Sequence, residues 1–192
     1  MPSAPAADEV SGVEPRTVGR SAPDEGVPRA ENDAGTGTGF ASVIAGARRR
    51  AVRDGDRQID SAHLLHSLLE SDPEARAAVG TPTQLARLLG YLVQRSIGYG
   101  LRWQGGAEVV GAEVAAGGER WSPVAAAALR DAEARGTLRR GAHGGADGVD
   151  LLAALVTDPR SRAVEVLERA GIPAGELRDR LRARTTDDAP PC

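Results

Sequence analysis

The stretch "HLLHSLLESDPEARA" at residues 63–77 has a counterpart later in the chain, "DLLAALVTDPRSRA" at residues 150–163. The two segments align at an offset of 87 residues, which becomes 86 after one deletion. Each consists of a leucine-rich run followed by an Asp-Pro pair, the usual order of a helix N-cap and the first helical position. A pattern repeated at a fixed offset indicates an internal duplication.

Apolar residues at helical spacing surround both copies of this stretch. Before the first copy, the segment from Phe40 to Ala51 forms one apolar face, and Gly55 follows where a helix C-cap is expected. Thr81-Pro82 and Ser122-Pro123 mark further helix starts. Each half therefore contains four predicted helices. The sequence predicts an all-α fold of eight helices, with two four-helix repeats related by a pseudo-twofold axis.

Composition changes along the chain predict where the ordered part begins and ends. The N-terminal residues are rich in Pro, Gly, Ala and acidic groups and have no sustained periodicity, so we expect a disordered tail. The stretch between the repeats is glycine-rich and leaves open a short hairpin or a loop. The predicted parts are a tail at 1–38, a double-repeat domain at 39–184 (repeat one 40–97, linker 98–120, repeat two 121–184) and a short tail at 185–192.

Charge and cysteine content narrow the functional classes. The 192 residues have a formal net charge of −3, and the 24 basic residues are all arginine. This near-neutral balance argues against a dedicated nucleic-acid binder. The single cysteine, Cys192, cannot form a disulfide within one chain. No apolar run approaches the ~18 residues of a membrane span, so we expect a cytoplasmic protein without membrane contact.

The order and spacing of these segments resemble the Clp N-terminal (Clp repeat) domain, which precedes the ATPase of Hsp100 unfoldases such as ClpC and ClpA. The resemblance covers about residues 40–184. It implies an all-α module without catalysis that captures substrates and adaptor proteins for an attached ATPase ring. This chain contains no G-x-x-x-x-G-K-[ST] motif, so we expect a free-standing Clp-repeat domain. The segments that carry the resemblance are the register from Val43 through His63-Leu64-Leu65, "SPVAAAALRDAEA", "DLLAALV" and "SRAVEVLERAGI".

The chain departs from this family at the positions that bind ligand. In ClpC-like members each short helix begins with "GTEH", whose Glu helps to recognise phosphorylated arginine. Here Ala62 and Val149 occupy the two Glu positions, so a carboxylate pair that could accept a guanidinium group is lost. The family's Phe precedes the Val matched by Val43 by seven residues, whereas Phe40 precedes it by three. The resemblance gives these candidate ligand- or peptide-binding residues: Phe40, Ala62, His63, Val149 and Asp150.

His63, His66 and Glu70 share one side of a predicted helix and could in principle hold a metal. The second copy has Asp150, Ala153 and Thr157 at the equivalent positions, so the duplication does not preserve a ligand set. We therefore predict no metal site, no cofactor and no catalytic group. Replacement of His63 by an aspartate in the second copy indicates that the helix N-terminus needs a hydrogen-bonding side chain there.

Three functional hypotheses remain. The first is a protein- or peptide-binding module of the Clp system, acting as an adaptor or as a decoy for ligands of the unfoldase's own N-domain. The second is sequestration of peptide-like antibiotics or other small ligands. The third is a regulatory helical nucleic-acid-binding protein that uses the arginines at 48, 49, 50, 53 and 57, although the apolar face at Val43 and Ala47 predicts an ordinary solvated surface for them. Trp103 and Trp121 flank the linker and could be interface anchors or structural residues between the repeats; for Trp121, beside a helix start, the structural role is favoured.

Overall fold

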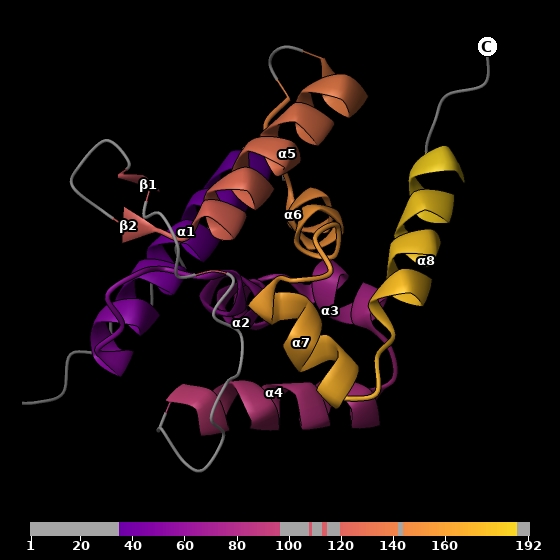
Figure 1. The fold of residues 1–192 in the computed structure, drawn as a ribbon. Helices are drawn as coiled ribbons and strands as arrows, with labels where there is room; N and C mark the ends of the chain where they lie inside the picture. The colour runs from indigo at the N-terminus through magenta and orange to yellow at the C-terminus, as the bar shows by residue number, and fades with distance from the viewer. Residues whose placement is uncertain (1–34, 97–107, 109–112, 115–119, 142–143, 188–192) are drawn as a thin grey trace, which may run out of the picture. The chain divides into compact units, whose positions relative to one another are not determined.

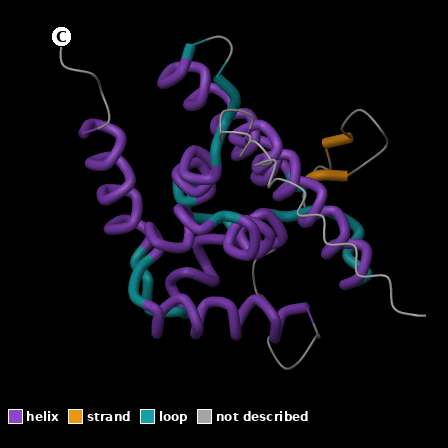
Figure 2. Tube along the Cα trace, turned by 180° about the vertical axis from the view of Figure 1, so that it is seen from behind, coloured by secondary structure: helices purple, strands orange, loops and turns teal. Residues whose placement is uncertain are grey.

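The computed structural model describes residues 35–96, 108, 113–114, 120–141 and 144–187, all within one compact unit. Helices form nearly all of this part, which confirms the predicted all-α fold (Figures 1 and 2). The helices of the first half are α1 (Gly35–Asp54), α2 (Ser61–Ser71), α3 (Pro73–Val79) and α4 (Pro82–Ser96). Those of the second half are α5 (Pro123–Arg140), α6 (Gly148–Leu155), α7 (Arg162–Arg169) and α8 (Ala174–Asp187).

The two halves pack in corresponding ways. Helix α1 packs on α2 as α5 packs on α6, and α2 also contacts α3, α6 and α7 (Figure 1). Small residues allow the helices of each pair to approach closely. Ala47 and Ala51 of α1 are buried, as are Ala132 and Gly136 of α5. A Cβ added at Gly136 would lie 2.8 Å from the backbone of Ala146, so glycine is required for this close approach.

Local signals place most helix starts correctly. The side chains of Asp72 and Ser122 accept hydrogen bonds from the amides of Ala75 (2.8 Å) and Ala125 (3.1 Å), as the Asp-Pro and Ser-Pro pairs predict. Gly55 has φ 72°, the left-handed conformation expected after α1. Helix α1 begins at Gly35, four residues before the predicted domain boundary at Gly39.

The predicted start of α7 at Asp158-Pro159 is wrong. Helix α7 begins at Arg162, and the buried Ser161 caps it by accepting from the amide of Val164 at 3.1 Å. Asp158 instead accepts from the amide of Arg160 at 2.8 Å. Such a bond two residues ahead forms a tight turn, which competes with helix initiation.

The described part of the stretch between the two halves contains two short paired strands, as one of the two alternatives for the linker predicts. Strands β1 (Glu113–Val114) and β2 (Arg120–Trp121) are antiparallel. The amide of Ile59 donates to the carbonyl of Arg120 at 2.8 Å, and the amide of Ser122 donates to that of Ile59 at 2.9 Å. Trp121 is buried, as expected of a structural tryptophan, and Trp103 lies outside the described residues. The tail predicted at 1–38 lies outside the described residues up to residue 34, and the last five residues of the C-terminal tail also lie outside them.

No helix in the described ranges combines the length and the apolarity needed to cross a bilayer.

Candidate functional site

The same capping arrangement occurs at the N-termini of α2 and α6. Asp60 accepts from the amides of Ala62 (3.0 Å) and His63 (3.1 Å), and Nδ1 of His63 accepts from the amide of Asp60 at 3.1 Å. In the second copy, Asp147 accepts from the amide of Asp150 at 2.7 Å, and Asp150 accepts from that of Asp147 at 3.2 Å. These reciprocal bonds form a capping box. The predicted need for a hydrogen-bonding side chain at this position is confirmed in both copies.

Asp60 is also the centre of a buried ion-pair network. It accepts from the guanidinium groups of Arg95 of α4 and Arg162, the latter at 2.6 Å. Its side chain is only 3% exposed. Burial alone would raise the pKa of Asp60, but the hydrogen bond with His63 and the charges of Arg95 and Arg162 lower it well below its usual range. Asp60 therefore links α2 to α4 and α7.

We call the N-terminus of α2 with Asp60 the first corner, and the N-terminus of α6 with Asp147 the second corner. Glu108, from the stretch between the repeats, adds a second buried carboxylate to the first corner. It accepts from the amide of Ser61 at 3.1 Å, the hydroxyl of Ser122 at 3.1 Å and the amide of Arg162 at 2.5 Å, and it also accepts from the hydroxyl of Ser61. These donors belong to the N-termini of α2, α5 and α7. One carboxylate thus satisfies polar groups at three helix starts from both repeats.

Asp56, Asp60 and His63 each place one potential ligand atom within 4.8 Å of the others, a spacing that could suit a metal ion. The same carboxylates are engaged by guanidinium groups, since Arg95 lies 3.0 Å from Asp56 and also binds Asp60. Nε2 of His63 lies 3.2 Å from Asp56. A metal ion would have to displace Arg95, because two cations cannot share these oxygens without strong repulsion. We interpret the cluster as an ion-pair network that stabilises the corner.

His66 does not join His63 in a common site. Nδ1 of His66 lies 3.1 Å from a guanidinium nitrogen of Arg50, and that guanidinium also pairs with Glu70. Burial and the charge of Arg50 together lower the pKa of His66 to about 4. The imidazole is therefore neutral near pH 7 and accepts from Arg50. His66 and Glu70 therefore share Arg50 as a partner, whereas His63 pairs with Asp56 and Asp60.

The five predicted ligand-binding residues differ in burial and in position. Ala62 and His63 are 0% and 1% exposed, so the prediction that they contact a ligand is corrected. The corner helix packs against the rest of the core with nine consecutive buried residues, which leaves no surface at its start. Phe40 is half-buried and packs on the core. Val149 and Asp150 line a hollow, in which Asp150 is itself buried and pairs with Arg139 and Arg140. A ligand-binding role for Phe40, Val149 and Asp150 stays a prediction.

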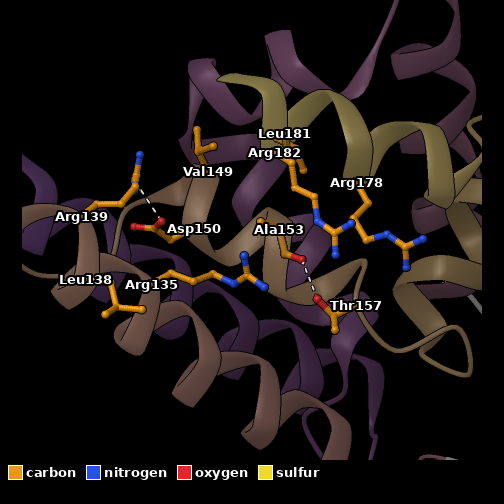
Figure 3. A pocket seen from close by; sticks show the side chains of 10 residues that line it. All are labelled: Arg135, Leu138, Arg139, Val149, Asp150, Ala153, Thr157, Arg178, Leu181 and Arg182. Atoms are coloured by element: carbon orange, nitrogen blue, oxygen red, sulfur yellow. Dashed lines mark hydrogen bonds and ion pairs between the residues drawn. The ribbon is translucent and has the colours of Figure 1, made fainter. Parts of the chain in front are cut away.

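This second-copy hollow lies between α5, α6 and α8 and has a volume of about 190 Å³ (Figure 3). Its apolar lining comes from Leu138, Val149, Ala153 and Leu181. Its basic lining comes from Arg135 and Arg139 of α5 and Arg178 and Arg182 of α8. Arg135 and Arg182 extend toward Ala153 and Thr157 from opposite sides (Figure 3).

The corresponding first-copy hollow lies between α1, α2 and α4 and has a volume of about 440 Å³. Arg50, His66 and Glu70 line it together with Arg53, Asp54, Val93 and Ser96. Both hollows therefore use the first, second and fourth helix of their repeat. This shared placement follows from the duplication.

Sequence reasoning missed the four arginines of the second-copy hollow and the buried Glu108. The arginines come from two helices about 40 residues apart, so no local motif joins them. Glu108 lies in a stretch without periodicity, and only its burial beside three helix starts reveals its role.

Comparison with known proteins identifies the fold and no more. No family model matches this chain, and no curated protein matches it. One similar solved structure comes from preliminary structural investigations of a malarial protein secretion system. It is 16% identical with a TM-score of 0.54, and the match covers 78% of this chain and 94% of that chain. At this identity the likeness supports a shared fold and carries no information about function.

Proposed function

We propose that this chain is a non-catalytic protein- or peptide-binding module of the Clp unfoldase–protease system, acting as an adaptor or as a decoy for ligands of the unfoldase's N-domain. The observation that carries the proposal is the hollow beside Val149 and Asp150. The resemblance to Clp repeats associates the position of Val149 with ligand recognition, and this position borders open space in the second copy. The first-copy corner instead has the role of a structural junction.

The size of the hollow favours a peptide over a small-molecule ligand. Pockets for drug-sized molecules are typically about 300–1,000 Å³, and the second-copy hollow has about 190 Å³. A space of this size accommodates one or two side chains of a partner protein. Sequestration of an antibiotic is therefore the weaker hypothesis.

The nucleic-acid hypothesis is weakened by the arrangement of the α1 arginines. Arg50 is 8% exposed and pairs with Glu70. Arg53 lies beside Asp54, with 3.5 Å between Nε and Oδ1. Paired arginines attract phosphate groups less, because their charge is already balanced. The α1 cluster therefore does not form a continuous basic stripe.

Affinity capture on the immobilised full chain tests the proposal. The analytes are a ClpC-type unfoldase and, separately, its protein substrates. We expect wild-type chain to retain one of them and Val149→Arg to lose at least ten-fold in affinity, because the long charged side chain fills the hollow. Val52→Arg is the matched control, since Val52 is 82% exposed on α1. Failure of the wild-type chain to retain either analyte would refute the proposed function.

A further inference from the structure

The two hollows occupy equivalent places but differ in charge balance: the first is balanced and the second has an excess of positive charge. The first-copy hollow has two arginines, Arg50 and Arg53, against two carboxylates, Asp54 and Glu70. The second-copy hollow has four arginines against the single carboxylate of Asp150. The duplicated framework has thus been kept while its lining has become strongly basic in one copy.

Residue-by-residue comparison locates the origin of this difference. When the buried pairs Ala47–Ala51 and Ala132–Gly136 are aligned, Arg135 takes the place of Arg50. In the same register, Arg139 takes the place of Asp54. From the repeat offset on α2 and α6, Ala153 and Thr157 replace His66 and Glu70. The second copy therefore has neither the imidazole nor the carboxylate that binds Arg50 in the first copy.

Two arginines of the second-copy hollow pair with carboxylates that do not line it. Arg182 lies 3.8 Å from Asp179 of its own helix. Arg139 pairs with Asp150 at 2.9 Å. Arg135 turns to Asp131 of its own helix, at 2.9 Å, where both side chains are more than a third exposed. Nε of Arg178 is buried and has no hydrogen-bond partner among the described residues. A buried donor without a partner is unfavourable, so an incoming acceptor gains by satisfying it.

We propose that the second-copy hollow binds an acidic segment of a partner protein, in which a Glu or Asp lies beside an apolar residue. The partner's carboxylate occupies the space above Thr157 that Glu70 fills in the first copy, and it accepts from Arg135, Arg178 and Arg182. The apolar residue packs on Leu138, which is 86% exposed, and on Val149. This apolar contact favours a peptide over a free anion, which could not use it.

The proposal rests on the proposed peptide-binding function and specifies its ligand. The probe is a fluorescein-labelled Ser-Glu-Leu-Glu-Ser peptide, with the Ser-Gln-Leu-Gln-Ser peptide as the uncharged comparison, measured by anisotropy on the full chain. We expect the Glu peptide to bind at least ten-fold more tightly than the Gln peptide. We also expect its binding to weaken as salt rises, because charge attraction is screened.

Thr157→Glu is the decisive variant, because it restores the carboxylate of the first copy. It should weaken binding of the Glu peptide at least ten-fold, while Thr157→Gln, of the same size without charge, should change it less than three-fold. Arg178→Gln should also weaken binding, and Arg87→Gln, which removes an exposed charge on α4, should not. Thr157 is exposed, so these variants should fold, and circular dichroism checks this.

Several outcomes would overturn the inference. Equal affinity for the Glu and Gln peptides, or equal binding by Thr157→Glu and wild type, contradicts an acidic ligand. Inorganic phosphate that binds as tightly as the peptide indicates a site for free anions instead. Capture of a Clp component that Thr157→Glu leaves unchanged refutes this ligand while the proposed function stands. Selective peptide binding without capture of any Clp component refutes the proposed function and supports this inference.

Discussion

The N-termini of α2 and α6 carry the same capping box, yet the two corners have different surroundings. Asp60 binds Arg95 and Arg162, which are 35 and 102 residues away in the sequence, and its side chain is 3% exposed. Asp147 binds Arg139 and Arg140, which are 8 and 7 residues away, and its side chain is 21% exposed. The ion pairs of Asp60 join helices that are distant in the sequence, whereas those of Asp147 are formed with the preceding helix.

This difference shows how a duplicated fold can divide its tasks. In the first copy, the N-terminus of α2 is a junction between the repeats. Asp60 binds Arg95 and Arg162 there, and Glu108 accepts from the amide of Arg162. In the second copy, Asp147 and Asp150 pair with Arg139 and Arg140 of the adjacent helix α5, and arginines dominate the lining of the neighbouring hollow. The structural role of the first copy and the binding role proposed for the second would then fall on equivalent positions of different repeats.

The largest expected effect tests the corners directly. Asp60→Ala should lower the free energy of unfolding by about 3–5 kcal/mol, because it leaves the charges of Arg95 and Arg162 without their buried partner. Asp147→Ala should lower it by only about 1 kcal/mol, the usual contribution of an N-cap, since Arg139 and Arg140 can turn to water. Urea denaturation measures both values. Equal losses would show that the two corners are energetically alike.

Glu108→Gln should have an intermediate effect. The amide keeps the shape of the carboxylate, but its NH₂ group faces donors at the starts of α2 and α7. We expect a loss of about 1–3 kcal/mol, the range for a buried hydrogen-bonding group left unsatisfied. The same substitution at Glu133, which is exposed on α5, is the control and should change stability little. A loss at Glu108 no larger than at Glu133 would remove its role as a junction between the repeats.

The smallest expected effect concerns pH. The pKa of His66 is about 4, against an ordinary value of 6.5. The unfolded chain therefore binds a proton at this residue before the folded chain does, and stability falls as pH drops from 6.5 toward 4. His66→Ala, which introduces the second-copy residue, should reduce this fall by about 1 kcal/mol between pH 6.5 and about 5.5, since one pKa unit corresponds to ~1.4 kcal/mol; this loss is equivalent to ~2–4 °C in Tm.

His63 is the internal comparison for the pH experiment. Burial opposes the charged imidazole, but Asp56, 3.2 Å from Nε2, and the nearby negative charge of Asp60 raise its pKa above 6.5. Its contribution to stability is therefore complete below pH 6.5 and is lost as pH rises through the folded-state pKa, the reverse of His66. Thermal melts of wild type and His66→Ala across pH 4–8 separate the two. An unchanged acid-side slope in His66→Ala would contradict the assignment.

The sequence by itself determined the helical elements and their duplication. Helical spacing of apolar residues and Asp-Pro or Ser-Pro starts depend on neighbours within one turn, so they can be recognised without the fold. The same local chemistry gave the capping role shared by His63 and Asp150. The prediction from local chemistry was wrong at the start of α7. Ser161 caps that helix because it is buried and its hydroxyl donates to the carbonyl of Leu155 at 3.1 Å, and this burial depends on the fold.

Only the tertiary structure decided which corner is closed and which hollow is charged. Ala62 looked like a position exposed to ligand, but packing of α2 against α3, α6 and α7 buries it completely. The partners of Asp60 and the four arginines of the second-copy hollow come from helices far apart in the chain. Burial and charge balance depend on neighbours that are distant in the sequence, and these neighbours cannot be predicted from local residue spacing.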